Sequence, residues 1–222
     1  MKKIIIITLI SILALTSLFF GKDSKEYGVF IGREKNKVLR LKNYDVLVVD
    51  AQYLSKKNIQ CLRKNNNKKV YSYLNVGSVE NFRPYYSQFK SITLGKYENW
   101  PEERWVDVSK KKWQKFILKK GKALKKKNID GLFIDNADVY YNYKKKKIYK
   151  GLTVILKSLK AEKMDIIING GDAYVLKAIR NNHPLKYIDG INQETFFSKI
   201  DFKRKKFLKQ NPKTTAYYKT YC

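Results

Sequence analysis

Residues 129–135 read Ile-Asp-Gly-Leu-Phe-Ile-Asp, a short and mainly apolar run that ends in an acid. A short run with so few polar positions is typical of a strand whose two faces are both covered, as in a parallel sheet. Two further runs, Val46–Val49 and Ile166–Ile168, are apolar throughout and are followed closely by Asp50 and Asn169. We therefore expect buried parallel strands that end at polar side chains.

Outward from these runs, β-rich stretches alternate with stretches of helical periodicity along most of the chain. The strands that we expect are 27–31, 44–50, 70–76, 129–135, 166–169, 187–194 and 214–221. Alternation of this kind favours an α/β protein with a parallel sheet. Seven such units in one small chain predict a (β/α) TIM-type barrel in preference to an open sheet.

The N-terminus predicts export. Its first three residues include two lysines and precede an apolar run from Ile4 to Phe20, which is the pattern of a secretory signal. The run also approaches the minimum length of a bilayer span. We expect residues 1–21 to be a signal peptide or an N-terminal anchor, and the protein to be extracellular, periplasmic or tethered to the membrane. Residues 22–222 fit one domain.

The net charge of +29 comes almost entirely from lysine, with only seven arginines in the chain. The lysines fall on segments with the pattern of outer helix faces, such as 110–127 and 144–150. Because phosphate and base recognition favours arginine, we expect no nucleic-acid partner. Attraction to an anionic envelope surface remains an expectation, and we expect a monomer.

The longest connection between expected strands, residues 76–129, contains an aromatic and proline-bearing stretch from 81 to 107. Loops of this length in compact domains are usually functional. Its rings could stack on sugar faces or pack the loop against the barrel, and both alternatives stay open for each ring. The rings are Tyr85, Tyr86, Tyr97, Trp100 and Trp105.

Five expected strands end in polar residues that an apolar core excludes: Asp50, Asn75, Asp135, Asn169 and Glu194. In a (β/α) barrel the carboxyl ends of the strands meet at one rim, where active sites are built. A helix cap or a turn explains Asp50 or Asn169 taken alone. Five such positions together predict a polar cup that holds at least two acids.

The sequence lacks the residue patterns on which histidine-, cysteine- and metal-based catalysis depend. The sole histidine, His183, is expected at the opposite rim, and Cys61 and Cys222 match no metal or redox spacing. Residues 135–138 lack the later glycine and glutamate of an EF-hand calcium loop, so we expect neither a metal nor a cofactor. Two acids across a polar cup fit glycosidic bond cleavage, in which one protonates the leaving oxygen and the other attacks the sugar or activates water.

Four segments resemble the endo-α-1,4-polygalactosaminidases of glycoside hydrolase family 114, over residues 27–221. They are YLNVGSVENFR (73–83), Trp100-Pro101 with WVDV (105–108), DGLFIDNAD (130–138) and Gln193-Glu194. The resemblance implies a TIM barrel that degrades a polysaccharide, with Asp135 and Glu194 as the catalytic pair. The roles of nucleophile and acid/base stay open. The substrate contacts that we expect are Asp50, Asn75, Arg83, Trp100, Trp105, Asn136, Asp138, Asn169 and Gln193.

The family's barrel has eight strands, whereas this chain ends just after the expected seventh. We therefore expect an incomplete barrel, with seven of eight strands present and open edges between strands seven and one. We expect the two carboxyl groups to have the closer, retaining spacing of about 5–5.5 Å, because each leaves a strand end.

A polymer of galactosamine is cationic and is repelled by a +29 protein at long range. The acidic cup reverses that sign only within about 8 Å, so a neutral, N-acetylated or anionic glycan is as reasonable a substrate. We expect an exported, endo-acting glycoside hydrolase of an amino-sugar polysaccharide. The alternative is a non-catalytic remnant of the same barrel that binds a glycan or the envelope.

Overall fold

The computed structural model describes residues 25–220. The expected signal or anchor segment, residues 1–21, and Cys222 lie outside the described residues. Among residues 25–220, no helix combines the length and the apolar character that crossing a membrane requires.

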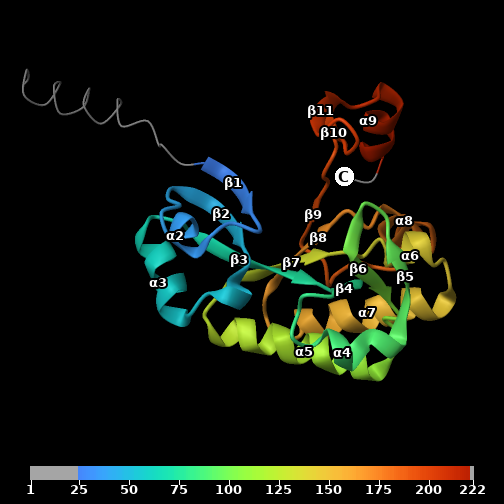
Figure 1. Ribbon diagram of the computed structural model, residues 1–222, viewed down its shortest axis with the longest axis horizontal. Coiled ribbons are helices and arrows are strands. Elements are labelled where there is room, and N and C mark those ends of the chain that lie inside the picture. Colours follow the sequence, from blue (N-terminus) through green and yellow to red (C-terminus); the bar gives the residue numbers. More distant parts are fainter. Residues whose placement is uncertain (1–24, 221–222) are drawn as a thin grey trace, which may run out of the picture.

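Six parallel strands form a curled sheet, a partial barrel (Figure 1). Their order in the sheet, β1-β2-β3-β7-β8-β9, is their order in the chain, and each neighbouring pair is parallel. This arrangement confirms the predicted α/β fold of an incomplete TIM-type barrel. The strands are β1 (Lys25–Phe30), β2 (Tyr44–Val49), β3 (Lys69–Asn75), β7 (Gly131–Asp135), β8 (Asp165–Asn169) and β9 (Gly190–Asn192).

Helices connect the strands and cover the outer face of the sheet, where the main core lies. The longest two, α5 (Lys111–Lys126) and α7 (Lys146–Lys160), pack against each other. Gly121 allows their close approach, because a Cβ there would lie 2.4 Å from the Leu159 side chain. The other helices are α2 (Lys35–Val38), α3 (Lys56–Lys64), α4 (Tyr86–Phe89), α6 (Val139–Asn142) and α8 (Asp172–Arg180), with 3₁₀ turns at Ala51–Tyr53 and Lys90–Ile92.

The long connection after β3 folds into a second, antiparallel sheet that the sequence pattern did not predict. Its strands are β4 (Ser78–Glu80), β5 (Thr93–Tyr97) and β6 (Trp100–Val106), in the order β4-β6-β5. The segment gives a weak strand signal because β4 is short and β6 carries a proline and three consecutive charged residues. The expected functional loop is thus an ordered sheet.

The expected seventh strand, residues 214–221, is wrong. Residues Pro212–Tyr218 form helix α9, which follows a hairpin of β10 (Ser198–Asp201) and β11 (Lys206–Lys209). Asn211 accepts a hydrogen bond from the backbone N–H of Lys213 at 2.8 Å, and Pro212 occupies the first turn. This helix-start chemistry outweighs the β propensity of the threonines and tyrosines that follow. Within residues 25–220 the barrel therefore has six parallel strands, not seven.

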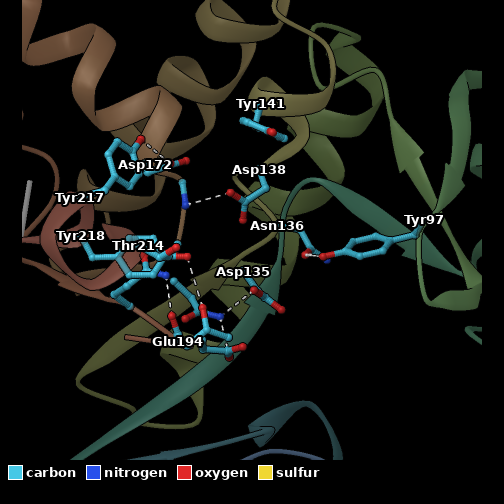
Figure 2. A pocket seen from close by; sticks show the side chains of 15 residues that line it. Tyr97, Asp135, Asn136, Asp138, Tyr141, Asp172, Glu194, Thr214, Tyr217 and Tyr218 are labelled. Carbon is cyan, nitrogen blue, oxygen red and sulfur yellow. Dashed lines mark hydrogen bonds between the residues drawn. The ribbon is translucent and has the colours of Figure 1, made fainter. Parts of the chain in front are cut away.

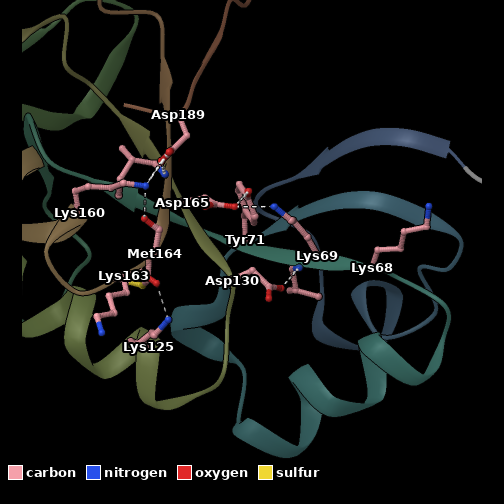
Figure 3. A network of polar contacts seen from close by, with 12 residues as sticks. Lys68, Lys69, Tyr71, Lys125, Asp130, Lys160, Lys163, Met164, Asp165 and Asp189 are labelled. Atoms are coloured by element: carbon pink, nitrogen blue, oxygen red, sulfur yellow. Dashed lines mark hydrogen bonds and ion pairs between the residues drawn. The ribbon is translucent and has the colours of Figure 1, made fainter. Parts of the chain in front are cut away.

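Acids tie the strands together at the edge where the parallel strands begin (Figure 3). Asp130 accepts hydrogen bonds from the Val70 backbone N–H at 2.8 Å and from Arg63 at 2.7 Å. Asp189 accepts from the Ile166 backbone N–H at 2.7 Å. The two backbone contacts join neighbouring strands, and the Arg63 contact joins α3 to the start of β7. This edge therefore has a structural role, as the amino-terminal face of a TIM barrel usually does.

Candidate active site

The five polar residues at the strand ends lie at the carboxyl edge of the sheet. Asp50 directly follows β2, and Glu194 lies just beyond β9. The last residues of β3, β7 and β8 are Asn75, Asp135 and Asn169, respectively. His183 lies between α8 and β9, at the edge where the strands begin. The parallel topology therefore separates the acids from the histidine, as the sequence indicates.

Asp135 and Glu194 are held by one amide group. The Asn169 side-chain nitrogen donates to Asp135 Oδ1 at 3.0 Å and to Glu194 Oε1 at 3.0 Å. Two acceptors on the divergent N–H bonds of a planar amide lie about 5 Å apart, and no more than ~6 Å. Figure 2 shows the two carboxyl groups close together in the cavity. These two oxygens therefore lie closer to the ~5–5.5 Å of a retaining pair than to the ~6.5–9.5 Å of an inverting pair.

Burial raises the pKa of the Asp135 carboxyl above its ordinary value, and the charge of Glu194 adds to the effect. Hydrogen bonds from Asn169, from the Asn136 backbone and from the Tyr73 hydroxyl act in the opposite direction. Donors that favour the ionised form therefore surround a carboxyl group that burial pushes toward the neutral form. Opposed influences of this kind are common where a carboxyl group takes part in catalysis.

Two cavities meet at the carboxylate pair. One, of about 540 Å³, extends toward α8 and α9 and is called here the α9 cavity. The other, of about 650 Å³, extends toward β6 and is called the β6 cavity. Four residues line both: Tyr97, Asp135, Asn136 and Glu194. The pair therefore lies between two spaces, each large enough for part of a ligand.

Asn136 connects the end of β7 to the antiparallel sheet. Its φ of 63° lies in the left-handed region, which asparagine tolerates better than most residues. Its amide donates to Ser78 Oγ at 2.8 Å and accepts from the Tyr97 hydroxyl at 3.1 Å. Gly77 makes the close approach possible, because a Cβ there would lie 1.7 Å from the Asn136 carbonyl oxygen.

Acidic residues dominate the wall of the β6 cavity. Glu80 and Glu103 face each other across the β4–β6 pair. Arg83 donates to Glu80 at 2.9 Å and lies 3.6 Å from Asp50. Glu103 accepts hydrogen bonds from two neutral donors, the Ser78 hydroxyl at 3.1 Å and the Asn136 amide at 3.5 Å. Burial, together with the charge of Glu80, raises the pKa of Glu103 to about 7.

The α9 cavity also carries acids. Burial raises the pKa of Asp138 to about 7, although the backbone N–H of Gly171 donates to its carboxyl group at 3.2 Å. Asp172 accepts from the Tyr217 hydroxyl at 2.6 Å. This contact joins α8 to α9, so the C-terminal helix forms one wall of the cavity (Figure 2).

The expected contact residues divide into three groups. Residues that line one or both cavities are Asp50, Arg83, Trp100, Asn136, Asp138, Asn169 and Gln193. Asn75 lines neither of these cavities, because its side chain accepts from the backbone N–H groups of Gly77 and Ser78 and so forms a turn. Trp105 is only 5% exposed and lines neither cavity; it stacks behind Tyr97 with ring centroids 4.2 Å apart. This geometry supports the packing alternative for Trp105.

The sequence pattern missed several residues that line the cavities. Glu80 and Glu103 belong to the unpredicted antiparallel sheet, and Asp172 and Tyr217 approach each other only because α9 folds against α8. Tyr73 lies within an apolar strand, where alternation alone does not reveal which face contacts the acids. Tyr73 lies two residues before Asn75, the polar end of β3, so both side chains point to the same face of the strand; this spacing was the available signal for Tyr73.

An open barrel with two carboxyl groups close together at the carboxyl ends of its strands is an arrangement found in glycoside hydrolases. Comparison with known protein families matches residues 22–195 to glycoside-hydrolase family GH114. The chain therefore belongs to family GH114, as its motifs predict. Comparison with curated protein sequences gives no match.

Solved structures share the fold at low sequence identity. The glycoside hydrolase domain of PelA from Pseudomonas aeruginosa has a TM-score of 0.71 and 14% identity, covering 90% of this chain and 78% of that one. Ega3 from Aspergillus fumigatus, in complex with galactosamine, has a TM-score of 0.62 and 18% identity, covering 79% and 68%. The α-galactosidase TtGalA from Thermus thermophilus has a TM-score of 0.56 and 11% identity, covering 77% and 41%.

Proposed function

We propose that the protein is an exported, endo-acting glycoside hydrolase of an amino-sugar polysaccharide, with Asp135 and Glu194 as its catalytic carboxylates. The observation that carries the proposal is the shared hydrogen bonding of these two carboxyl groups to one amide nitrogen, at 3.0 Å each. Membership of family GH114 supports glycosidic bond cleavage in general.

The spacing favours a retaining, double-displacement reaction. One carboxylate attacks the anomeric carbon while the other carboxyl group protonates the leaving glycosidic oxygen. The second group then takes a proton from water, which attacks the anomeric carbon and releases the first carboxylate. Two carboxyl groups this close do not both ionise freely, so one is protonated at the start of the cycle.

Internal cleavage is supported by the two cavities. They extend from the carboxylate pair in different directions, one toward α9 and the other toward β6. A polymer that occupies both places an internal linkage at the pair. An enzyme that removes single end units needs room for one sugar on one side only.

An amino-sugar substrate is supported by the charge of the cavity walls. Among the residues that line the β6 cavity, Asp50, Glu80, Glu102 and Glu103 are acidic in addition to the pair, and Arg83 is the single lysine or arginine. The charge near the pair is thus opposite to the net +29 of the chain. An ammonium group on a sugar compensates buried carboxylates. The relative Ega3, solved with galactosamine, agrees with this ligand chemistry.

Export and attraction to an anionic envelope rest on the sequence. The positively charged start and the apolar run of residues 4–20 support a secretory signal or an anchor. The exposed lysines of α5 and α7 support electrostatic association with an anionic surface. Fractionation of the producing cells tests the first point, and release from the surface by salt tests the second.

The activity is tested with the full chain on de-N-acetylated polygalactosamine and on its fully N-acetylated form. The proposal predicts new reducing ends from the first polymer and products several units long at early times. Binding without release would favour the non-catalytic remnant. Release of single sugars alone would contradict internal cleavage, and equal rates on both polymers would contradict a requirement for the free amine.

A further inference from the structure

Asn169 uses every hydrogen-bonding group of its side-chain amide near the carboxylate pair. Its nitrogen donates to Asp135 and to Glu194, both at 3.0 Å. Its oxygen accepts from the Asn192 side-chain nitrogen at 2.6 Å. The side chain is almost fully buried, with 7% of the residue exposed. No donor of this amide therefore remains for a substrate.

The neighbouring strand sets the orientation of the Asn169 amide, because it places the Asn192 side chain next to it. Asn169 and Asn192 are the last residues of β8 and β9, and they are partners in the parallel register of those strands. Because Asn192 donates to the oxygen of the Asn169 amide, the nitrogen must face the carboxyl groups. A reversed amide would turn its oxygen toward two carboxyl groups and its nitrogen toward a donor.

We propose that Asn169 is a positioning residue that sets the separation of Asp135 and Glu194, and that Asn192 fixes the orientation of its amide. The inference rests on the proposed function, since a fixed separation of two carboxyl groups is what double displacement requires. In this role Asn169 contacts the carboxyl groups and not the sugar. This differs from the substrate-binding role that its position at a strand end led us to expect.

Loss of this amide has two separable consequences. The carboxyl groups lose their common donor, so their separation is no longer fixed, and misplacement by about 1 Å costs roughly 10²-fold in rate. Asp135 also loses a donor that favours its ionised form, so its already raised pKa rises further. A residue that only binds sugar would change KM and leave both the turnover and this pKa unchanged.

The experiment compares the parent with Asn169→Ala and Asn192→Asp. We expect kcat to fall about 10²-fold in Asn169→Ala with KM within about threefold of the parent, and the limb of the pH profile that reports Asp135 to move to higher pH. Asn192→Asp should reproduce the fall in kcat, because a carboxylate cannot donate to the Asn169 oxygen. Asn66→Asp makes the same chemical change in the turn before β3, at the other edge of the sheet, and should leave kcat unchanged.

A parent that hydrolyses polymer while Asn169→Ala keeps its kcat and pH profile would overturn the inference and leave the proposed function standing. A second measurement does not depend on turnover. In protein labelled with ¹³C at aspartate carboxyl carbons, titration followed by NMR should give Asp135 a higher pKa in Asn169→Ala than in the parent. An unchanged pKa in a folded variant would overturn the inference even if no substrate were cleaved.

Discussion

Replacing Glu103 by glutamine should stabilise the protein at neutral pH while weakening substrate binding. Glu103 lies opposite Glu80 in the β4–β6 register, and it accepts hydrogen bonds from the neutral Ser78 hydroxyl and Asn136 amide. Two acids directly opposite in a sheet repel each other. Glutamine keeps the acceptor oxygen for Ser78 and removes the charge.

The size and pH range of the effect follow from the pKa of Glu103, which rises from 4.5 to about 7 in the folded protein. The folded state then binds the proton more tightly than the unfolded state, so stability falls as pH rises from about 4.5 to about 7. At ~1.4 kcal/mol per pKa unit the upper bound is about 3.5 kcal/mol. Partial exposure of Glu103 reduces this to about 1–2 kcal/mol.

Urea unfolding of parent and Glu103→Gln at a series of pH values measures the difference. The variant should match the parent below pH 4 and exceed its stability above pH 7, while KM for the cationic polymer rises. Glu102→Gln, an exposed neighbour on the same strand and in the same cavity, is the matched control and should do little to stability. A Glu103→Gln variant less stable than the parent at pH 8 would refute the reasoning.

Two further predictions compare the two edges of the sheet and two tryptophans of one strand. Trp100 is 52% exposed in the β6 cavity, whereas Trp105 is 5% exposed. Trp100→Ala should raise KM by up to about tenfold with little change in unfolding free energy. Trp105→Ala should lower the unfolding free energy by about 3–5 kcal/mol. If urea unfolding and steady-state assays gave the reverse pattern, Trp105 and not Trp100 would be the ring that contacts substrate. Asp130→Ala should lower the unfolding free energy by about 2–4 kcal/mol, because the Val70 N–H loses its acceptor and Arg63 loses its partner. The kcat of the folded fraction should stay at the parent value. A large loss of kcat would instead give this edge of the sheet a catalytic role.

Apolar runs that end in polar residues carried most of the correct prediction of the fold and of the edge that holds the acids. In 129–135 and 166–169, burial of both faces leaves little choice but a parallel strand, and parallel strands place their ends together. Asp135, Asn169 and Glu194 follow directly from that geometry. The family motifs pointed to the same two acids.

Contacts between distant segments, and in one case a local helix cap, decided the rest. Trp100 and Trp105 belong to one strand, and only the packing of β5 against β6 buries Trp105 behind Tyr97. Residues 214–221 have strand propensity, but the Asn211-Pro212 pair just before them starts a helix, and this local capping decided the outcome. The role of Asn169 depends on which partner faces each end of its amide, which no sequence pattern encodes.

The central claim is that Asp135 and Glu194 form the catalytic pair. The most direct measurement is kcat for reducing-end release by Asp135→Asn and by Glu194→Gln, with polymer binding and urea unfolding measured on the same preparations. The account predicts that each variant folds, binds polymer and loses at least about 10³-fold in kcat, since each step of double displacement needs both groups. Near-parental kcat in either variant, on a polymer that the parent cleaves, would contradict it.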